Sequence, residues 1–396
     1  MIRHVLGRVL VSACAVAAGA AVAAGQRGGG ADNPFPGGAN PDGSLRPTAP
    51  LTRLFTQDAY TEYAILDPGS ESFRIRFLPE ETRTGATELV NATRGGSEGS
   101  GIEVYDPRTG KPMPFTYEQD PKDPDTHAVH AKLPIPVPAG GIGRVLVYKT
   151  YKDARTYMMH GDDIVWVRSL SGYRLGVLLP KGFAFLSSNV AAQLSTTSEG
   201  RLKLAFANPS GQSNPVTIHT RRTTASFTPT PGDDMFFDDV KTIYDLGAPE
   251  THRITVDQSY SDYRKGAKAT LNSLSYLAMQ DVTVTDLDTA HVLTPVKAGP
   301  ATTVALEVPV TADHQSAHLR ITGTLTDPGY AIDRGDLVFS RMLKGLRNTV
   351  LLPTGYEVSA VSQSATIGKY EGRTFVALIN LNHENQYTIR IRARKP

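Results

Sequence analysis

The chain has 396 residues with 41 Lys+Arg and 39 Asp+Glu, so its formal net charge is +2. This near balance leaves no excess of Lys and Arg side chains to bind the phosphates of a nucleic acid. We therefore expect no nucleic-acid partner. A hydrophobic content of 40% excludes disorder over the whole chain, and the single cysteine excludes an intramolecular disulfide. A packed core must therefore stabilise the fold.

The first 25 residues have the three parts of a secretion signal. Arg3 and Arg8 supply positive charge, an apolar run covers 9–24, and Ala21-Val22-Ala23 matches a cleavage pattern. The run is short for a membrane span, and no basic stop-transfer cluster follows it. We therefore expect a signal peptide over 1–25 and an exported protein, periplasmic or extracellular, with no transmembrane helix in the mature chain.

Cys14 allows a second interpretation of this segment, because Val11-Ser12-Ala13 before it fits a loose lipoprotein processing site. The apolar stretch between Arg8 and Cys14 is too short for that signal, so cleavage near residue 25 is favoured over a lipid anchor. The mature chain then has no cysteine, which suits an oxidising exterior. Residues 26–50 are rich in Gly and Pro and predict a disordered linker.

The rest of the chain contains an internal repeat. DIVWVRSLSGYRLGVLLPKGF from Asp163 and DLVFSRMLKGLRNTVLLPTGY from Asp336 share nine residues at one constant spacing from Arg168 and Arg341 onward. We predict repeat 1 over 51–229 and repeat 2 over 230–396. The shared structural motif comprises Pro180, Gly182, Glu199, Gly200 and Arg201 in repeat 1, and Pro353, Gly355, Glu371, Gly372 and Arg373 in repeat 2.

Inside each repeat, apolar residues alternate with polar ones, as in Ile389-Arg390-Ile391-Arg392, which is typical of half-buried strands. The Leu-Leu-Pro-x-Gly motif ends a buried strand, and Glu-Gly-Arg indicates a tight turn. Only 267–279 has helix-like spacing. The prediction is an all-β fold with two tandem duplicated antiparallel β-sandwich (Ig-like) domains. Whether each repeat is one sandwich or two small lobes stays open.

The repeats share no constellation of His, Asp or Ser, so we assign no catalytic residues. Tyrosines are dense enough in repeat 1 to line a ligand-binding face, although strands are rich in tyrosine in any case. The tyrosines in question are Tyr60, Tyr63, Tyr151 and Tyr157.

Four aspartates, Asp233, Asp234, Asp238 and Asp239, crowd the boundary between the repeats. Carboxylates clustered in a loop can hold Ca²⁺, but this spacing matches no regular calcium loop, and a solvated acidic linker is the simpler interpretation. No other cofactor is expected, because the histidines lack the spacing of a zinc site.

These features favour a noncatalytic binding, adhesion or scaffold module of the cell envelope, with a glycan or protein partner. The alternative is a secreted hydrolase acting on glycans or peptides, or accessory domains of one. Its candidate carboxylates are Asp162, Asp163 and Glu199, of which Asp163 and Glu199 recur in repeat 2.

Overall fold

The structure is a computed structural model that describes residues 60–93, 97–120, 123–170, 174–207, 214–230, 240–270, 279–298, 301–380 and 386–396. The expected signal peptide and linker, and most of the segment with helix-like spacing, lie outside these ranges. Regular structure within them is almost entirely β, with one short 3-10 helix at Pro249–Thr251. The all-β prediction is confirmed. In the described ranges no helix is long and apolar enough to cross a membrane.

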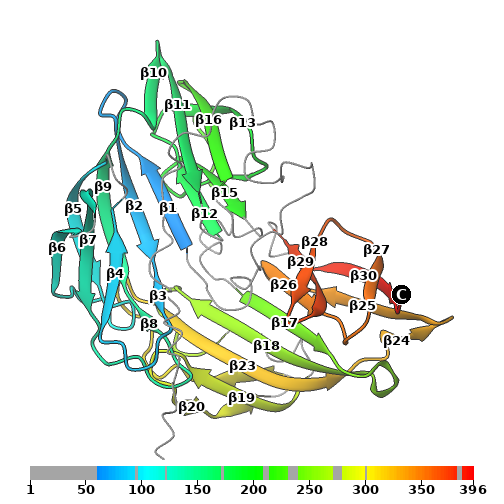
Figure 1. The fold of residues 1–396 in the computed structure, drawn as a ribbon. Coiled ribbons are helices and arrows are strands. Elements are labelled where there is room, and N and C mark those ends of the chain that lie inside the picture. Colours follow the sequence, from blue (N-terminus) through cyan, green and yellow to red (C-terminus); the bar gives the residue numbers. More distant parts are fainter. Residues whose placement is uncertain are drawn as a thin grey trace, which may run out of the picture.

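A large sheet forms the base of the first half (Figure 1). Its strand order is β14 (Gln193–Thr196), β15 (Leu202–Ala207), β12 (Arg174–Leu178), β1 (Tyr60–Ile65), β2 (Ser72–Leu78), β9 (Leu146–Lys152) and β5 (Glu98–Tyr105). The pairing of β1 with β12 is parallel, unlike the purely antiparallel sandwich expected from the sequence. The reason is that the chain returns from a covering sheet and enters β12 in the direction of β1.

Two smaller sheets cover one face of this base. The first contains β10 (Tyr157–His160), β11 (Asp163–Leu170), β16 (Asn214–Arg222) and β13 (Phe183–Ser188). The second contains β4 (Glu88–Ala92), β7 (Asp123–Lys132) and β6 (Phe115–Asp120), and a short pair joins β3 (Glu80–Glu81) to β8 (Gly143–Arg144). Trp166 lies in the core under the first cover, and Val129 lies in a separate core under the second. The half is therefore one base sheet with two cores.

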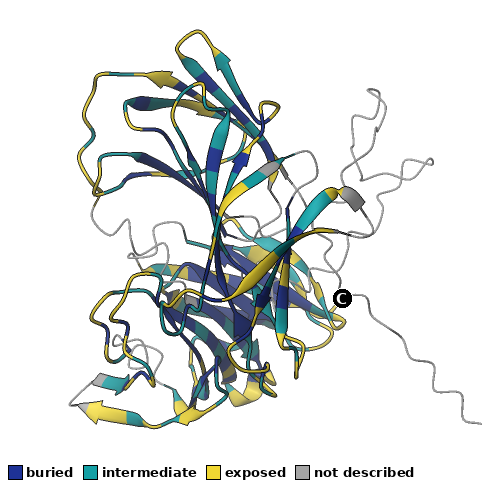
Figure 2. Cartoon of the chain, turned by 90° about the vertical axis from the view of Figure 1, so that its left-hand side faces the viewer, coloured by how far each residue is buried: buried dark blue, intermediate teal, exposed yellow. Residues whose placement is uncertain are grey.

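The second half repeats this plan. Its large sheet reads β28 (Thr366–Tyr370), β29 (Arg373–Ile379), β26 (Arg347–Leu351), β17 (Val240–Leu246), β18 (Arg253–Asp262), β23 (Ala317–Thr326), β19 (Gln280–Asp286) and β20 (Val292–Leu293). Its covering strands are β24 (Tyr330–Asp333), β25 (Asp336–Leu343), β30 (Tyr387–Arg394) and β27 (Glu357–Val361), with the hairpin β21 (Pro295–Ala298) and β22 (Ala301–Val304). Apart from β20, the base sheets match strand for strand, including a parallel β17–β26 pair. Burial is concentrated where the sheets face one another (Figure 2).

The two halves meet through reciprocal backbone contacts. The Ser316 N–H of the second half donates to the Pro107 carbonyl at 2.7 Å, and the Ile142 N–H of the first half donates to the Leu287 carbonyl at 2.7 Å. An apolar contact lies elsewhere in the interface, where Leu346 packs against Tyr60. Each half thus donates one N–H to a turn of the other.

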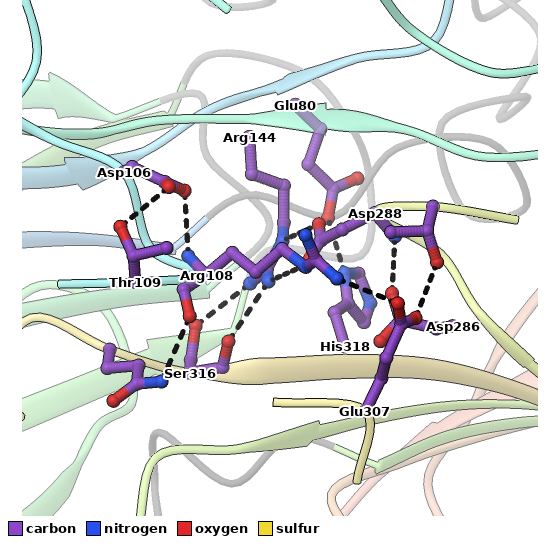
Figure 3. A network of polar contacts seen from close by, with 12 residues as sticks. Glu80, Asp106, Arg108, Thr109, Arg144, Asp286, Asp288, Glu307, Ser316 and His318 are labelled. Atoms are coloured by element: carbon purple, nitrogen blue, oxygen red, sulfur yellow. Dashed lines mark hydrogen bonds and ion pairs between the residues drawn. The ribbon is translucent and has the colours of Figure 1, made fainter. Parts of the chain in front are cut away.

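Charged side chains fill the space between these turns (Figure 3). The Arg144 guanidinium donates to both carboxylate oxygens of Asp288, at 2.7 and 2.5 Å, and to the Ser316 hydroxyl at 2.9 Å. Glu80 lies 3.7 Å from His318 across the same boundary. Burial, followed by the charge of Asp288, raises the pKa of the Asp286 carboxyl. Buried polar contacts therefore link the two halves at this boundary.

Candidate functional site

The four tyrosines expected to line a ligand face are all buried, with at most 9% of any of them exposed. The Tyr157 hydroxyl donates to the Leu66 carbonyl at 3.1 Å, and burial raises its pKa to about 12. The hydroxyl of Tyr330, its counterpart in the second half, makes the equivalent bond to the Gly247 carbonyl. Tyr60 packs in the junction between the halves. As a group the four tyrosines do not form an exposed face, and two of them have structural roles.

Tyr63 and Tyr151, however, lie together around a buried cation. The guanidinium carbon of Arg168 lies 4.9 Å from the ring centroid of Phe73, 5.4 Å from that of Tyr63 and 5.5 Å from that of Tyr151. Along β11, Ile164, Trp166 and Arg168 alternate toward the base sheet, which places this arginine in the core with 6% exposed. Cation–π attraction to three rings partly offsets its desolvation.

Lys149 enters the same region from the base sheet. On β9 it lies between Val147 and Tyr151 on the inward face, and 2% of the residue is exposed. Val147 belongs to the second core and Tyr151 to the first, so the lysine sits at their boundary. Its ammonium group donates to the Ala92 carbonyl at 3.3 Å. This is a long bond that uses one of three donors.

The two cations affect one another electrostatically. Burial, and after it the positive charge of Arg168, lowers the pKa of Lys149 to about 7. Within the described ranges, the Nη1 group of Arg168 has no hydrogen-bond partner, and neither cation has an ion-pair partner. Buried charges are normally paired, because an isolated one loses its hydration without compensation. This cluster of Lys149, Arg168, Tyr63, Phe73 and Tyr151 is hereafter the cation pocket.

The second half lacks this arrangement at the matching positions. Arg341, the counterpart of Arg168, forms an ion pair with Asp327. Lys149 lies opposite Ile75 in the first base sheet. Val256, the counterpart of Ile75, lies opposite Gly323 in the second, so Gly323 is the counterpart of Lys149. A Cβ on Gly323 would lie 2.9 Å from the Gln280 carbonyl oxygen, which leaves no room there for a lysine side chain. At these two matched positions of the described chain, a buried cation without an ion-pair partner therefore occurs in the first half alone.

The shared motif residues have structural roles in both halves. The Arg201 side chain donates to the Leu179 carbonyl at 2.8 Å, and Arg373 donates to the Leu352 carbonyl at 2.8 Å. Positive φ angles occur at the turn glycines Gly182, Gly200, Gly355 and Gly372. Pro180 and Pro353 follow the two buried strands after one intervening leucine. Glu199 lies in the turn between β14 and β15, and Glu371 in the turn between β28 and β29.

The remaining carboxylate candidates do not converge. Asp163 forms an exposed ion pair with Arg221 at 2.9 Å, and Asp162 lies 3.7 Å from Arg222. Among the described residues, no group of three or more His, Cys, Asp or Glu side chains could hold a metal ion. The calcium candidates Asp233, Asp234, Asp238 and Asp239 lie outside the described residues.

Sequence reasoning missed Lys149 and Arg168, although a signal for each was present. Val147, Lys149 and Tyr151 alternate with outward residues, so the period of two already places a lysine in the core. Arg168 recurs as Arg341, but only the structure shows that one copy has a carboxylate partner and the other has none.

In chemical terms, the cation pocket presents two buried cationic donors beside three aromatic rings. No protein-family model matches the chain, and no curated protein matches it. Among solved structures, it is similar to an aminopeptidase N family protein from Idiomarina loihiensis at 11% identity, with a TM-score of 0.27. That similarity covers 41% of this chain and 29% of the other. A likeness this weak carries no argument about fold or activity.

Proposed function

We propose that the chain is an exported, noncatalytic protein of the cell envelope, built from two copies of one β-sandwich, and that it binds a ligand in its first half. The duplication is supported by the repeated sequence motif, by matching strand orders and by matching arginine contacts to strand carbonyls. Export is supported by the three-part pattern of the first 25 residues.

The observation that carries the binding role is the difference between the halves. If the two copies were purely structural, we would expect the buried arginine to have a partner in both. Instead, Arg341 pairs with Asp327, while Arg168 lies beside Lys149 without a carboxylate partner among the described residues. A buried charge that is left unpaired is costly, and such costs are concentrated at functional sites.

The hydrolase alternative has less support. Asp163 and its counterpart Asp336 both form ion pairs beside hairpin turns, with Arg221 and Arg392 respectively. This repeated arrangement fits a structural role, whereas a glycosidase needs two carboxyl groups facing one bond. Accessory domains of a larger enzyme would be compatible with the same binding role.

A binding screen with a parallel turnover assay tests this proposal. The full chain, purified after export by its own N-terminal segment, is screened against glycans, peptidoglycan fragments and peptides. We expect binding without turnover, and weaker binding in Arg168→Met than in the matched second-half variant Arg341→Met. Turnover of any bound compound would overturn the noncatalytic role, and equal effects of the two variants would place the binding site elsewhere.

A further inference from the structure

We propose that the cation pocket binds a small organic carboxylate that carries a hydroxyl or amino group, such as a hydroxy acid or sugar acid. This inference rests on the proposed binding role and names its ligand class. It follows from three features: the donors that the pocket presents, the acceptors beside them, and the aromatic wall around the guanidinium.

The donors come from two different layers of the first half. Arg168 reaches down from β11 in the covering sheet, and Lys149 reaches up from β9 in the base sheet. Guanidinium groups bind planar carboxylates particularly well, and the lysine adds a compact charge that needs no fixed geometry. A carboxylate between them would supply the negative charge that Asp327 supplies to Arg341 in the second half.

Acceptors lie next to these donors at the end of β4. Ala92, whose carbonyl accepts from Lys149, is flanked by Asn91 and Thr93, which are 9% and 2% exposed. Within the described part of the chain, the Asn91 Oδ1 and Thr93 Oγ1 atoms have no hydrogen-bond partner. Buried polar atoms of this kind are normally satisfied. A hydroxyl or ammonium group on the ligand can donate to them while its carboxylate meets the cations.

The surroundings favour a carboxylate over inorganic phosphate. The ring faces of Tyr63, Phe73 and Tyr151 line the guanidinium and present apolar surface to it. A phosphate dianion has four oxygens and needs donors on every side, whereas a carboxylate has a carbon skeleton that can contact rings. The cluster lies at the boundary between the two cores of the first half.

At alkaline pH, the protein must take up a proton when it binds such an anion. The amine of Lys149 is largely neutral above pH 7, and an adjacent carboxylate favours its charged form. The groups that face it are Arg168 from β11 and Tyr151 from β9, whose ring centroid lies 5.4 Å from the lysine nitrogen. Phenols ordinarily ionise near pH 10, well above this range. The dissociation constant should therefore rise about tenfold per pH unit above about pH 8.

Isothermal titration calorimetry of the full exported chain between pH 6 and pH 9 tests this proposal. The probes are lactate, gluconate and glucuronate, with glucose as the neutral counterpart of the sugar acids and inorganic phosphate as the competing anion. We expect saturable binding of at least one acid, at least tenfold weaker in Lys149→Met and Arg168→Met. Lys149→Arg should bind without the pH slope, because its charge does not titrate.

Two variants serve as controls. Lys152→Met removes an exposed lysine from the same strand, and His127→Asn removes the imidazole that stacks on Tyr117 of the covering sheet. Both should retain the affinity and the pH slope of the native chain. Binding of none of the acids, phosphate binding in their place, or equal affinity in Lys149→Met would overturn the carboxylate site. Glycan or peptide binding that Lys149→Met leaves intact would reject this inference but keep the proposed binding role.

Discussion

Arg144 and Asp288 form a buried, two-point ion pair that joins the two halves of the chain across 144 residues of sequence. Only 1% of the arginine side chain is exposed. We expect Arg144→Ala to lower the free energy of unfolding by about 3–5 kcal/mol, because it leaves a buried carboxylate without its cation. Urea denaturation measures this loss.

Arg83→Ala is the matched control for that experiment, since Arg83 forms an ion pair with Glu81 but is 70% exposed. Its loss should cost less than about 1 kcal/mol. The double variant Arg144→Met/Asp288→Leu should recover part of the stability lost in Arg144→Ala. Equal costs for the two single variants would show that the junction does not depend on this pair.

Asp286, beside the junction, should make the protein less stable at neutral pH. Burial and the neighbouring charge of Asp288 raise its pKa in the folded state, so stability falls as the pH rises through that value. Asp286→Asn keeps an oxygen for the Asp288 N–H, which donates to it at 2.9 Å, and removes the charge. We expect a higher unfolding midpoint at pH 7 and no gain at pH 3. A lower midpoint at pH 7 would contradict this assignment.

Asp327 forms an ion pair with the largely buried Arg341 of the second half, so its removal should take away a carboxylate that Arg168 lacks among the described residues. We expect Asp327→Ala to cost about 3–5 kcal/mol of unfolding free energy, because Arg341 is 15% exposed. Asp257→Ala, which removes the partner of the half-exposed Arg320, should cost less than about 1 kcal/mol. Chemical denaturation of both variants checks this difference, and similar costs would argue against a special role for Asp327.

Lys149 should destabilise the folded state below pH 7, where both folded and unfolded forms carry the charge. Its pKa falls from 10.5 to about 7 on folding, so unfolding takes up a proton between these values and stability rises with pH across that window. Lys149→Met should be more stable at pH 6 by roughly 1–3 kcal/mol, because a tenfold change in proton affinity corresponds to about 1.4 kcal/mol. Denaturation at pH 6 and pH 9 measures this effect. A variant that is less stable at pH 6 would refute it.

The sequence predicts the all-β class and the repeated motif well, because period-two alternation and Leu-Leu-Pro-x-Gly turns depend on local chemistry. The parallel β1–β12 pair was not predicted, since register between distant strands leaves no local pattern. Tyr63 and Tyr151 were sensible ligand candidates by residue type, but the strand pleat turns both inward. The role proposed for these two residues depends on whether Arg168 has a hydrogen-bond or ion-pair partner. Only the packing of the sheets on one another determines that.

The most direct test of the cation pocket is the titration of Lys149 itself, followed by NMR on protein with ¹³C-labelled lysine side chains. We predict one lysine with a pKa near 7, absent from Lys149→Met, whose pKa rises above about 8 when a bound carboxylate is added. Titration of every lysine near pH 10.5, or a signal near 7 that no carboxylate moves, would contradict the cation pocket as a carboxylate site.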